Sequence, residues 1–178
     1  MQIRTSSAAD LPAVLQVHRQ AFGQEEEAGL TRAILVDPTA APTLSLLAED
    51  DGAALGHILF SRVRLTDPDS GCAAAILAPL AVVPAAQGRG IGGKLIEAGL
   101  ARLREAGVTL VFVLGDPGYY NRYGFTPAGQ QGLTAPYPIP EAHAEAWMVQ
   151  ALRDGVLGEV QGSVTCCDAL MQPELWRE

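Results

Sequence analysis

The chain has 178 residues, of which 48% are hydrophobic and 18% are charged, and its formal net charge is −8. These values predict one globular domain spanning residues 1–178 with a sizeable core, and they exclude a largely disordered chain. The acidic balance argues against a broad nucleic-acid-binding surface. No apolar run approaches the ~20 residues that a membrane span needs. The start of the chain also lacks a basic-then-apolar signal segment, so we expect a cytoplasmic protein with no membrane partner.

The first half of the chain predicts two helices and a β-hairpin after a short opening strand. Ser7-Ala-Ala-Asp10 has the pattern of a capping box, and apolar residues at helical spacing follow it. Asp50-Asp51-Gly52 separates two apolar runs, which is typical of a hairpin. The expected elements are a strand over 2–4, a helix ending near Phe22, a shorter helix over 30–35, and strands over 43–49 and 54–63.

A third apolar run, from Cys72 to Val83, contains a proline at position 79. Proline cannot donate to a sheet ladder, so Pro79 predicts a bulge or an edge in this strand. A distortion there would leave backbone N–H and C=O groups near Ala81 and Val83 able to pair with something other than protein. An ordinary edge strand is the alternative.

The most informative stretch runs from Leu80 to Gly92, where a strand leads through a glycine loop into a helix. Gly88, Gly90 and Gly92 let the main chain approach a ligand closely. The helix behind them starts with unpaired N–H groups and the positive end of its dipole, so the stretch predicts an anion site for phosphate or pyrophosphate.

Two nucleotide-binding motifs fit this loop poorly. Gly88 to Lys94 matches the G-x4-G-K part of a P-loop, but Leu95 stands where a Ser or Thr should hold Mg²⁺. The pattern G-x-G-x-x-G is also present, yet Asp116 lies too far along the chain for the ribose-binding acid of a dinucleotide fold, and too few residues follow it.

The second half of the chain predicts one amphipathic helix and three strands. At 100° per residue, the apolar residues of the helix over 90–106 share one face, and Gly107 is its expected end. The β-branched run over 109–114 predicts a buried strand with parallel neighbours. Two more strands are expected over 147–152 and 160–166, which completes a mixed α/β sheet with helices on both faces.

The chain carries two motifs in an order that resembles the GNAT-type N-acetyltransferases. The first is Gln87-x-x-Gly90-x-Gly92, and the second is Tyr119-Tyr120-Asn-Arg122-Tyr-Gly124-Phe125, which is similar to F-Y-x-K-x-G-F. The resemblance covers residues 2 to about 165. It implies a mostly antiparallel, twisted sheet with a bulged, splayed fourth strand, and acetyl-CoA as cosubstrate.

The resemblance also implies roles for individual residues. A backbone N–H, most naturally that of Val82, would stabilise the oxyanion, and Tyr120 would protonate the departing thiolate while Tyr119 packs. Many family members have an Asn a few residues earlier, where this chain has Asp116-Pro117-Gly118. The implied cofactor-binding residues are Ala81, Val82, Val83, Gln87, Gly88, Arg89, Gly90, Ile91 and Gly92. Whether Lys94 contacts phosphate stays open.

The general base is not identified. The run over 73–83 contains no carboxylate, which leaves His57, Glu49 and the segment 25–27 as candidates, or no base at all if the amine loses its proton to water. Three cysteines at positions 72, 166 and 167 have neither the number nor the spacing of a disulfide framework or a metal clamp, so we expect no metal.

These motifs predict direct transfer of an acetyl group to a primary amine in a ternary complex. The acceptor would be a small molecule or a peptide, and the protein a monomer or a homodimer. The alternatives are a non-catalytic acyl-CoA-binding module and a nucleotide-binding protein that uses the glycine loop.

Overall fold

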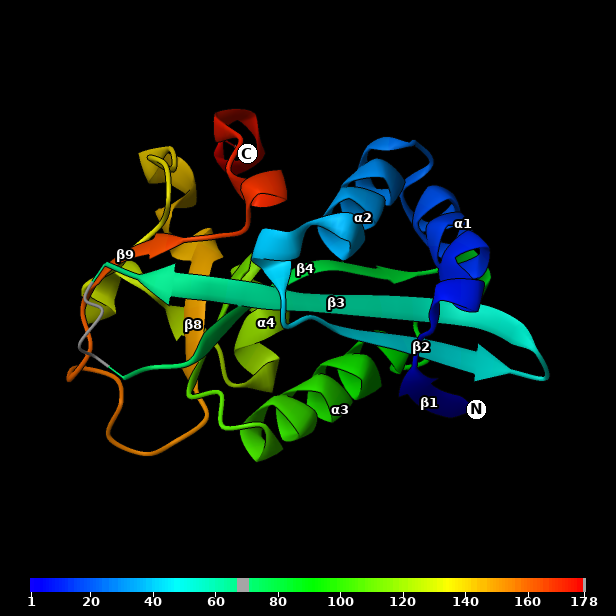
Figure 1. The fold of residues 1–178 in the computed structure, drawn as a ribbon, viewed down its shortest axis with the longest axis horizontal. Coiled ribbons are helices and arrows are strands. Elements are labelled where there is room, and N and C mark those ends of the chain that lie inside the picture. The colour runs from blue at the N-terminus through cyan, green and yellow to red at the C-terminus, as the bar shows by residue number, and fades with distance from the viewer. Residues whose placement is uncertain (67–70, 178) are drawn as a thin grey trace.

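The computed structural model describes residues 1–66 and 71–177. Within these residues, nine strands join in one sheet along the path β1-β2-β3-β4-β5-β8-β6, and β9 pairs with β3 and β7 (Figure 1). Every pair along that path is antiparallel except β4–β5. The predicted mixed, mostly antiparallel sheet is therefore confirmed. The strands are β1 Gln2–Thr5, β2 Leu44–Asp50, β3 Ala53–Leu65, β4 Ala74–Val82, β5 Leu110–Leu114, β6 Thr126–Pro127, β7 Leu133–Thr134, β8 Trp147–Ala151 and β9 Gly162–Thr165.

Helices cover both faces of the sheet, as the sequence predicts. The first helix, α1 (Leu11–Phe22), and the second, α2 (Glu26–Val36), lie on one face, and α3 (Ile91–Glu105) lies on the other (Figure 1). The predicted capping box forms, because the Ser7 N–H donates to Asp10 Oδ2 over 2.7 Å. The second helix starts earlier than predicted, since two glutamates in its first turn favour the positive end of the helix dipole. None of the described helices is long and apolar enough to cross a bilayer.

The core beneath α3 follows the helical face that the sequence predicts. Ile91, Leu95, Ile96 and Leu103 are all buried against the sheet. Gly99 has no side chain because the Phe60 ring of β3 occupies the position where its Cβ would stand. The last turn of α3 ends before Gly107, whose φ of +89° is left-handed.

The fourth strand is bulged and splayed, which confirms the prediction from Pro79. In its register with β3, Ile58 faces Leu80 and Phe60 faces Leu77, so the two residues at positions 78 and 79 oppose one. β4 pairs with β5 only from Ala74 to Leu77. Beyond that point β4 runs on to Val82 without pairing with β5.

The end of the chain differs in part from the prediction. Strands β8 and β9 confirm the two expected strands, but β5 has a parallel neighbour on one side and an antiparallel one on the other. The expectation of parallel neighbours on both sides is wrong, because the chain comes back along β5 as the antiparallel strand β8. A continuous apolar run shows that a strand is buried, but it does not show the direction of the neighbouring strands. One further short helix, α4 (Pro117–Tyr120), follows β5.

Candidate functional site

The glycine loop takes its shape from backbone conformations that only glycine adopts easily. Gly88 and Gly90 have φ angles of +79° and +77°, and a Cβ at either position would meet nothing within 4 Å. The side chain of Gln87 closes the loop, since its Nε2 donates to the Val82 carbonyl over 3.0 Å. The two left-handed residues therefore bring bare backbone to the start of α3 and leave open space beside it.

A cavity of about 500 Å³ lies against this loop and the first turn of α3. Four N–H groups at a helix start have no partner within the helix, so the backbone alone already favours an anion in this cavity. One wall is the loop and the other is α4 with the turn after it. The lining residues are Val82, Ala86, Gln87, Gly88, Gly90, Ile91, Gly92, Gly93, Tyr119, Arg122 and Tyr123.

Six of the nine predicted cofactor-binding residues line this cavity, and three do not. Ala81 and Val83 are buried beside it, and the exposed Arg89 lies outside its lining. A phosphate contact by Lys94 receives no support, because its exposed side chain also lies outside the lining. The cation at the cavity is instead Arg122, whose guanidinium carbon lies 5.1 Å from the Tyr119 ring centre.

Gly92 and Gly93 have a packing role that the sequence did not indicate. A Cβ at Gly92 would stand 2.5 Å from the Tyr119 hydroxyl, and one at Gly93 would stand 2.8 Å from Cε1 of Tyr123. These two glycines therefore make room for tyrosine side chains, and both also line the cavity. Sequence reasoning missed Tyr119, Tyr123 and Arg122 as wall residues; the adjacent glycines and the cluster of tyrosines were the available signal.

The splayed part of β4 presents backbone to the gap between β4 and β5. The Val83 N–H donates to the Leu55 carbonyl over 2.9 Å, so the expectation that this group is unpaired is wrong. Because backbone groups alternate along a strand, the N–H of Val82 points away from β3. Its carbonyl does the same, as its bond to Gln87 demonstrates.

Tyr120 lies next to that gap, at the carboxyl end of β5. Its ring contacts Gly115, which follows the last residue of β5, and packs edge-on against Phe125 with ring centres 5.7 Å apart. The half-buried Tyr120 is not part of the cavity lining described above. Burial, followed by the neighbouring Tyr119 and Asp116, raises the pKa of Tyr120 above its ordinary value. Burial also raises the pKa of Tyr119 to about 12, so both phenols are protonated at neutral pH.

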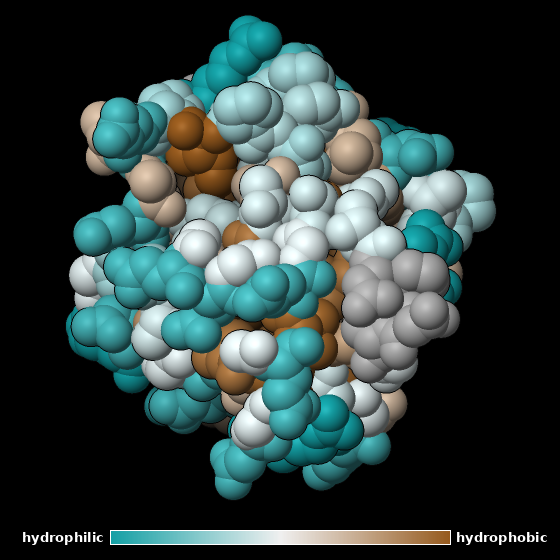
Figure 2. Space-filling view, turned by 90° about the vertical axis from the view of Figure 1, so that its left-hand side faces the viewer, coloured by the Kyte–Doolittle hydropathy of each residue, from teal (hydrophilic) through white to brown (hydrophobic). Residues whose placement is uncertain are grey.

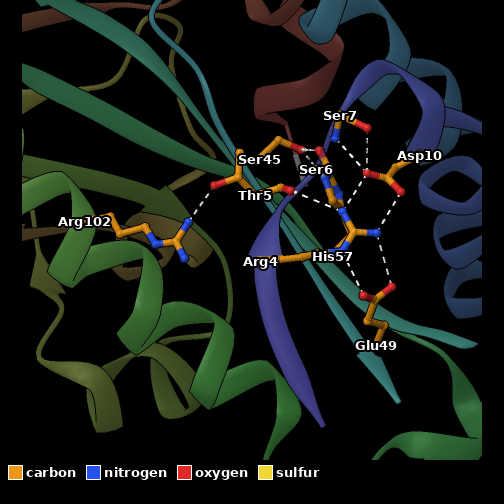
Figure 3. Close-up of polar contacts among 9 residues, drawn as sticks. All are labelled: Arg4, Thr5, Ser6, Ser7, Asp10, Ser45, Glu49, His57 and Arg102. Atoms are coloured by element: carbon orange, nitrogen blue, oxygen red, sulfur yellow. Dashed lines mark hydrogen bonds and ion pairs between the residues drawn. The ribbon is translucent and has the colours of Figure 1, made fainter. Parts of the chain in front are cut away.

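The candidate bases all have other partners. Glu49 accepts from Arg4 Nε over 2.8 Å, and Asp10 binds the same guanidinium (Figure 3). His57 is fully buried, and its two ring nitrogens contact His18 at 2.9 Å and Ser45 at 2.7 Å.

In the acidic segment, Glu25 pairs with Arg19, while Glu26 and Glu27 accept from Gln24. None of these candidates contributes to the cavity lining. Within residues 1–66 and 71–177, no cluster of three or more His, Cys, Asp or Glu side chains could hold a metal ion.

Comparison with known proteins agrees with this geometry. A family model described as the acetyltransferase (GNAT) domain matches residues 2–128. The protein named uncharacterized N-acetyltransferase YjhQ of Escherichia coli K12 is 45% identical over 161 residues, which cover 90% of this chain and 88% of that protein.

Two solved structures are also similar. The crystal structure of the GNAT family N-acetyltransferase YhbS from Escherichia coli in complex with CoA has a TM-score of 0.85 and 31% identity, and covers 96% of this chain and 92% of its own. That of a GNAT family acetyltransferase from Brucella melitensis in complex with acetyl-CoA has a TM-score of 0.73 and 34% identity, with 94% and 96% coverage. This chain belongs to the GNAT family of N-acetyltransferases and is an enzyme of the acyltransferase class.

Proposed function

We propose that the protein transfers the acetyl group of acetyl-CoA directly to a primary amine while both substrates are bound. The observation that carries this proposal is the juxtaposition of three features: an open glycine loop at the start of α3, the end of β4 that does not pair with β5, and Tyr120 at the end of β5. The similar structures with CoA and acetyl-CoA support the choice of donor. We treat residues 1–178 as one catalytic domain, and a cytoplasmic location stays a prediction.

The residues around the cavity fit the donor. Open space beside Gly88 and Gly90 and the unpaired N–H groups of α3 suit a pyrophosphate, and Arg122 adds a positive charge at the same wall. From there the pantetheine arm would run along β4, where the N–H of Val82 faces the gap. Ala81, Val83 and Arg89 stay predicted contacts.

Within this arrangement, acetyl-CoA supplies a thioester carbonyl that the amine nitrogen attacks. The Val82 N–H would donate to the carbonyl oxygen as it gains negative charge. The carbon–sulfur bond then breaks, and Tyr120 would give its proton to the sulfur, because a phenol that stays protonated at neutral pH is a competent acid for a thiolate. The nitrogen, which becomes positively charged when it attacks, releases one proton to water as the amide forms, and Tyr120 regains its proton from solvent.

The attacking amine must arrive neutral. His57 and Glu49 are held by partners away from the cavity, so we propose that the amine loses its proton to water rather than to a dedicated base. The acceptor is a small-molecule or peptide primary amine, and the catalytic unit is a monomer or a homodimer.

The test is an acceptor screen that follows thiol release from acetyl-CoA with polyamines, aminoglycosides, and peptides with a free N-terminus or a lysine. With the best acceptor, Tyr120→Phe should lower kcat by roughly 10²–10⁴-fold and leave the KM for acetyl-CoA nearly unchanged. Tyr119→Phe is the matched control. It removes a hydroxyl at the cavity wall, so it should change that KM and leave kcat within a few-fold.

Three outcomes would contradict the proposal. If Tyr119→Phe alone lowered kcat, the acid assignment would be wrong. If CoA raised the melting temperature but no acceptor released thiol, the binding module would be the better assignment. If ATP or NAD raised the melting temperature and CoA did not, the protein would be a nucleotide binder.

A further inference from the structure

A second cavity, of about 630 Å³, lies at the opposite end of α3 from the glycine loop. It exists because α3 ends at Glu105 while β3 runs on to Leu65, so the helix leaves the last part of this sheet face uncovered (Figure 1). The floor comes from β3 and the start of β4, and the walls come from the end of α3 and the segment before β2. Among the described residues, none lines both this cavity and the one at the glycine loop.

The lining of this second cavity combines apolar side chains with three arginines. Arg62 and Arg64 alternate with the buried Val63 on β3, so both point to the α3 side of the sheet, and Arg102 reaches the cavity from α3. The surface at this end of the molecule shows hydrophobic patches between hydrophilic side chains (Figure 2). The apolar lining residues with large side chains on the α3 side of the sheet are Leu44, Phe60, Leu103 and Val108.

The described lining residues of this cavity include three arginines and no carboxylate. Three of the eleven arginines meet here in a protein with a net charge of −8. Within the described part of the chain, neither Arg62 nor Arg64 has a carboxylate partner. Arg102 donates to the Thr5 hydroxyl over 2.6 Å (Figure 3), and among the described residues no carboxylate forms an ion pair with it.

We propose that this cavity is a second ligand site, which binds a small carboxylate with an apolar body. The volume lies within the range of small-molecule sites, and an apolar lining with a few convergent polar groups is their usual composition. A planar guanidinium binds a carboxylate with two parallel hydrogen bonds. The apolar floor excludes a polyphosphate, which would leave its charges against Phe60 and Leu103, and selects a chain or ring that carries one acidic group.

The experiment titrates octanoate into the full-length protein in the presence of saturating CoA, with isothermal titration calorimetry as the readout. CoA blocks the glycine-loop cavity, and octylamine is the probe with the same apolar body and the opposite charge. We expect saturable octanoate binding and none for octylamine. The double variant Arg62→Gln/Arg64→Gln should bind octanoate at least tenfold more weakly and keep the CoA affinity of the original protein, because both side chains are exposed and far from the loop.

Two further variants locate the site. Ala106→Trp places bulk on an exposed lining residue and should also weaken octanoate binding, whereas Arg32→Gln, an exposed arginine of α2, should not. The proposal is overturned if octanoate does not bind, if octylamine binds equally well, or if the double variant binds octanoate unchanged. Sedimentation velocity adds one more outcome: if the double variant converts a dimer to a monomer, a second copy of the chain occupies this face and the ligand assignment is wrong. None of these results depends on acetyl transfer.

Discussion

Acidification should destabilise the fold through two buried histidines on the α1 side of the sheet. His18 and His57 are fully buried, and a chain of short contacts links them to Ser45 and Ser6. Burial lowers the pKa of His18 to about 4; burial and the charge of His18 lower that of His57 to about 3. Both rings are therefore neutral in the folded protein at pH 5.5, while the unfolded chain, with histidine pKa values near 6.5, binds two protons.

This difference in bound protons sets the sign and the size of the change in the free energy of unfolding with pH. As the pH falls below about 6.5, proton binding stabilises the unfolded state relative to the folded state. The free energy of unfolding therefore keeps falling until the pH reaches the folded pKa values. One unit below the unfolded pKa, each ring contributes about 1.4 kcal/mol, so the free energy of unfolding should fall by roughly 2–3 kcal/mol between pH 7.5 and 5.5. Asp10 does not add to this loss, because its bond to Arg4 lowers its pKa and the group stays ionised throughout the range.

Urea unfolding at pH 7.5, 6.5 and 5.5 measures this loss as a shift in midpoint at constant slope. The double variant His18→Gln/His57→Gln should be less stable at pH 7.5, yet its free energy of unfolding should barely change down to pH 5.5. His143→Gln, which removes the exposed third histidine, should keep the original pH dependence. If the original protein lost less than about 0.5 kcal/mol over this range, the two rings would be charged or accessible in the folded state and the reasoning would fail.

Two further predictions concern the glycine-loop cavity. Gly90→Val should reduce CoA affinity more than tenfold by calorimetry, because the added side chain occupies the space beside the loop. Gly107→Val, which strains the other end of α3 at a similar φ, should bind CoA normally. Equal CoA affinity in both folded variants would contradict the assignment. Of these two arginines only Arg122 lines the cavity, so Arg122→Gln should weaken CoA binding more than Arg89→Gln does. The effect of Arg122→Gln should be larger at low salt than at high salt. A larger effect of Arg89→Gln would instead assign the phosphate contact to Arg89.

The sequence predicts those elements of the fold whose own residues carry a periodic pattern. The buried face of α3 and the bulge at Pro79 are local properties, since helical spacing and a missing N–H suffice to predict them. Strands β6 and β7 have two residues each, which is too short for any alternation to be visible. The antiparallel partner of β5 is set by the path of the chain after Gly115, and no residue in β5 encodes it.

The candidate site, like the fold, has one part that the sequence predicts and another that depends on contacts between separate elements. The glycine loop is visible in the sequence because left-handed backbone at Gly88 and Gly90 is a requirement of the residues themselves. The wall formed by Tyr119 and Arg122 depends on how α4 docks on α3, which is a tertiary contact between separate elements. Sequence reasoning therefore identified the left-handed backbone of the loop and missed the packing of Tyr119 against Gly92.

The short helix α4 connects the two halves of the proposed site. Neighbouring residues on a helix point about 100° apart, so Tyr119 faces the start of α3 while Tyr120 faces the end of β5. Asp116 fixes this helix, because its side chain accepts from the Gly118 N–H over 2.9 Å at the helix start. Asp116-Pro117-Gly118, where many family members have an Asn, thus has a structural role of its own: an acceptor at the helix start holds the single turn that carries both tyrosines, so under the proposed function Asp116 would position the donor-site wall and the acid together.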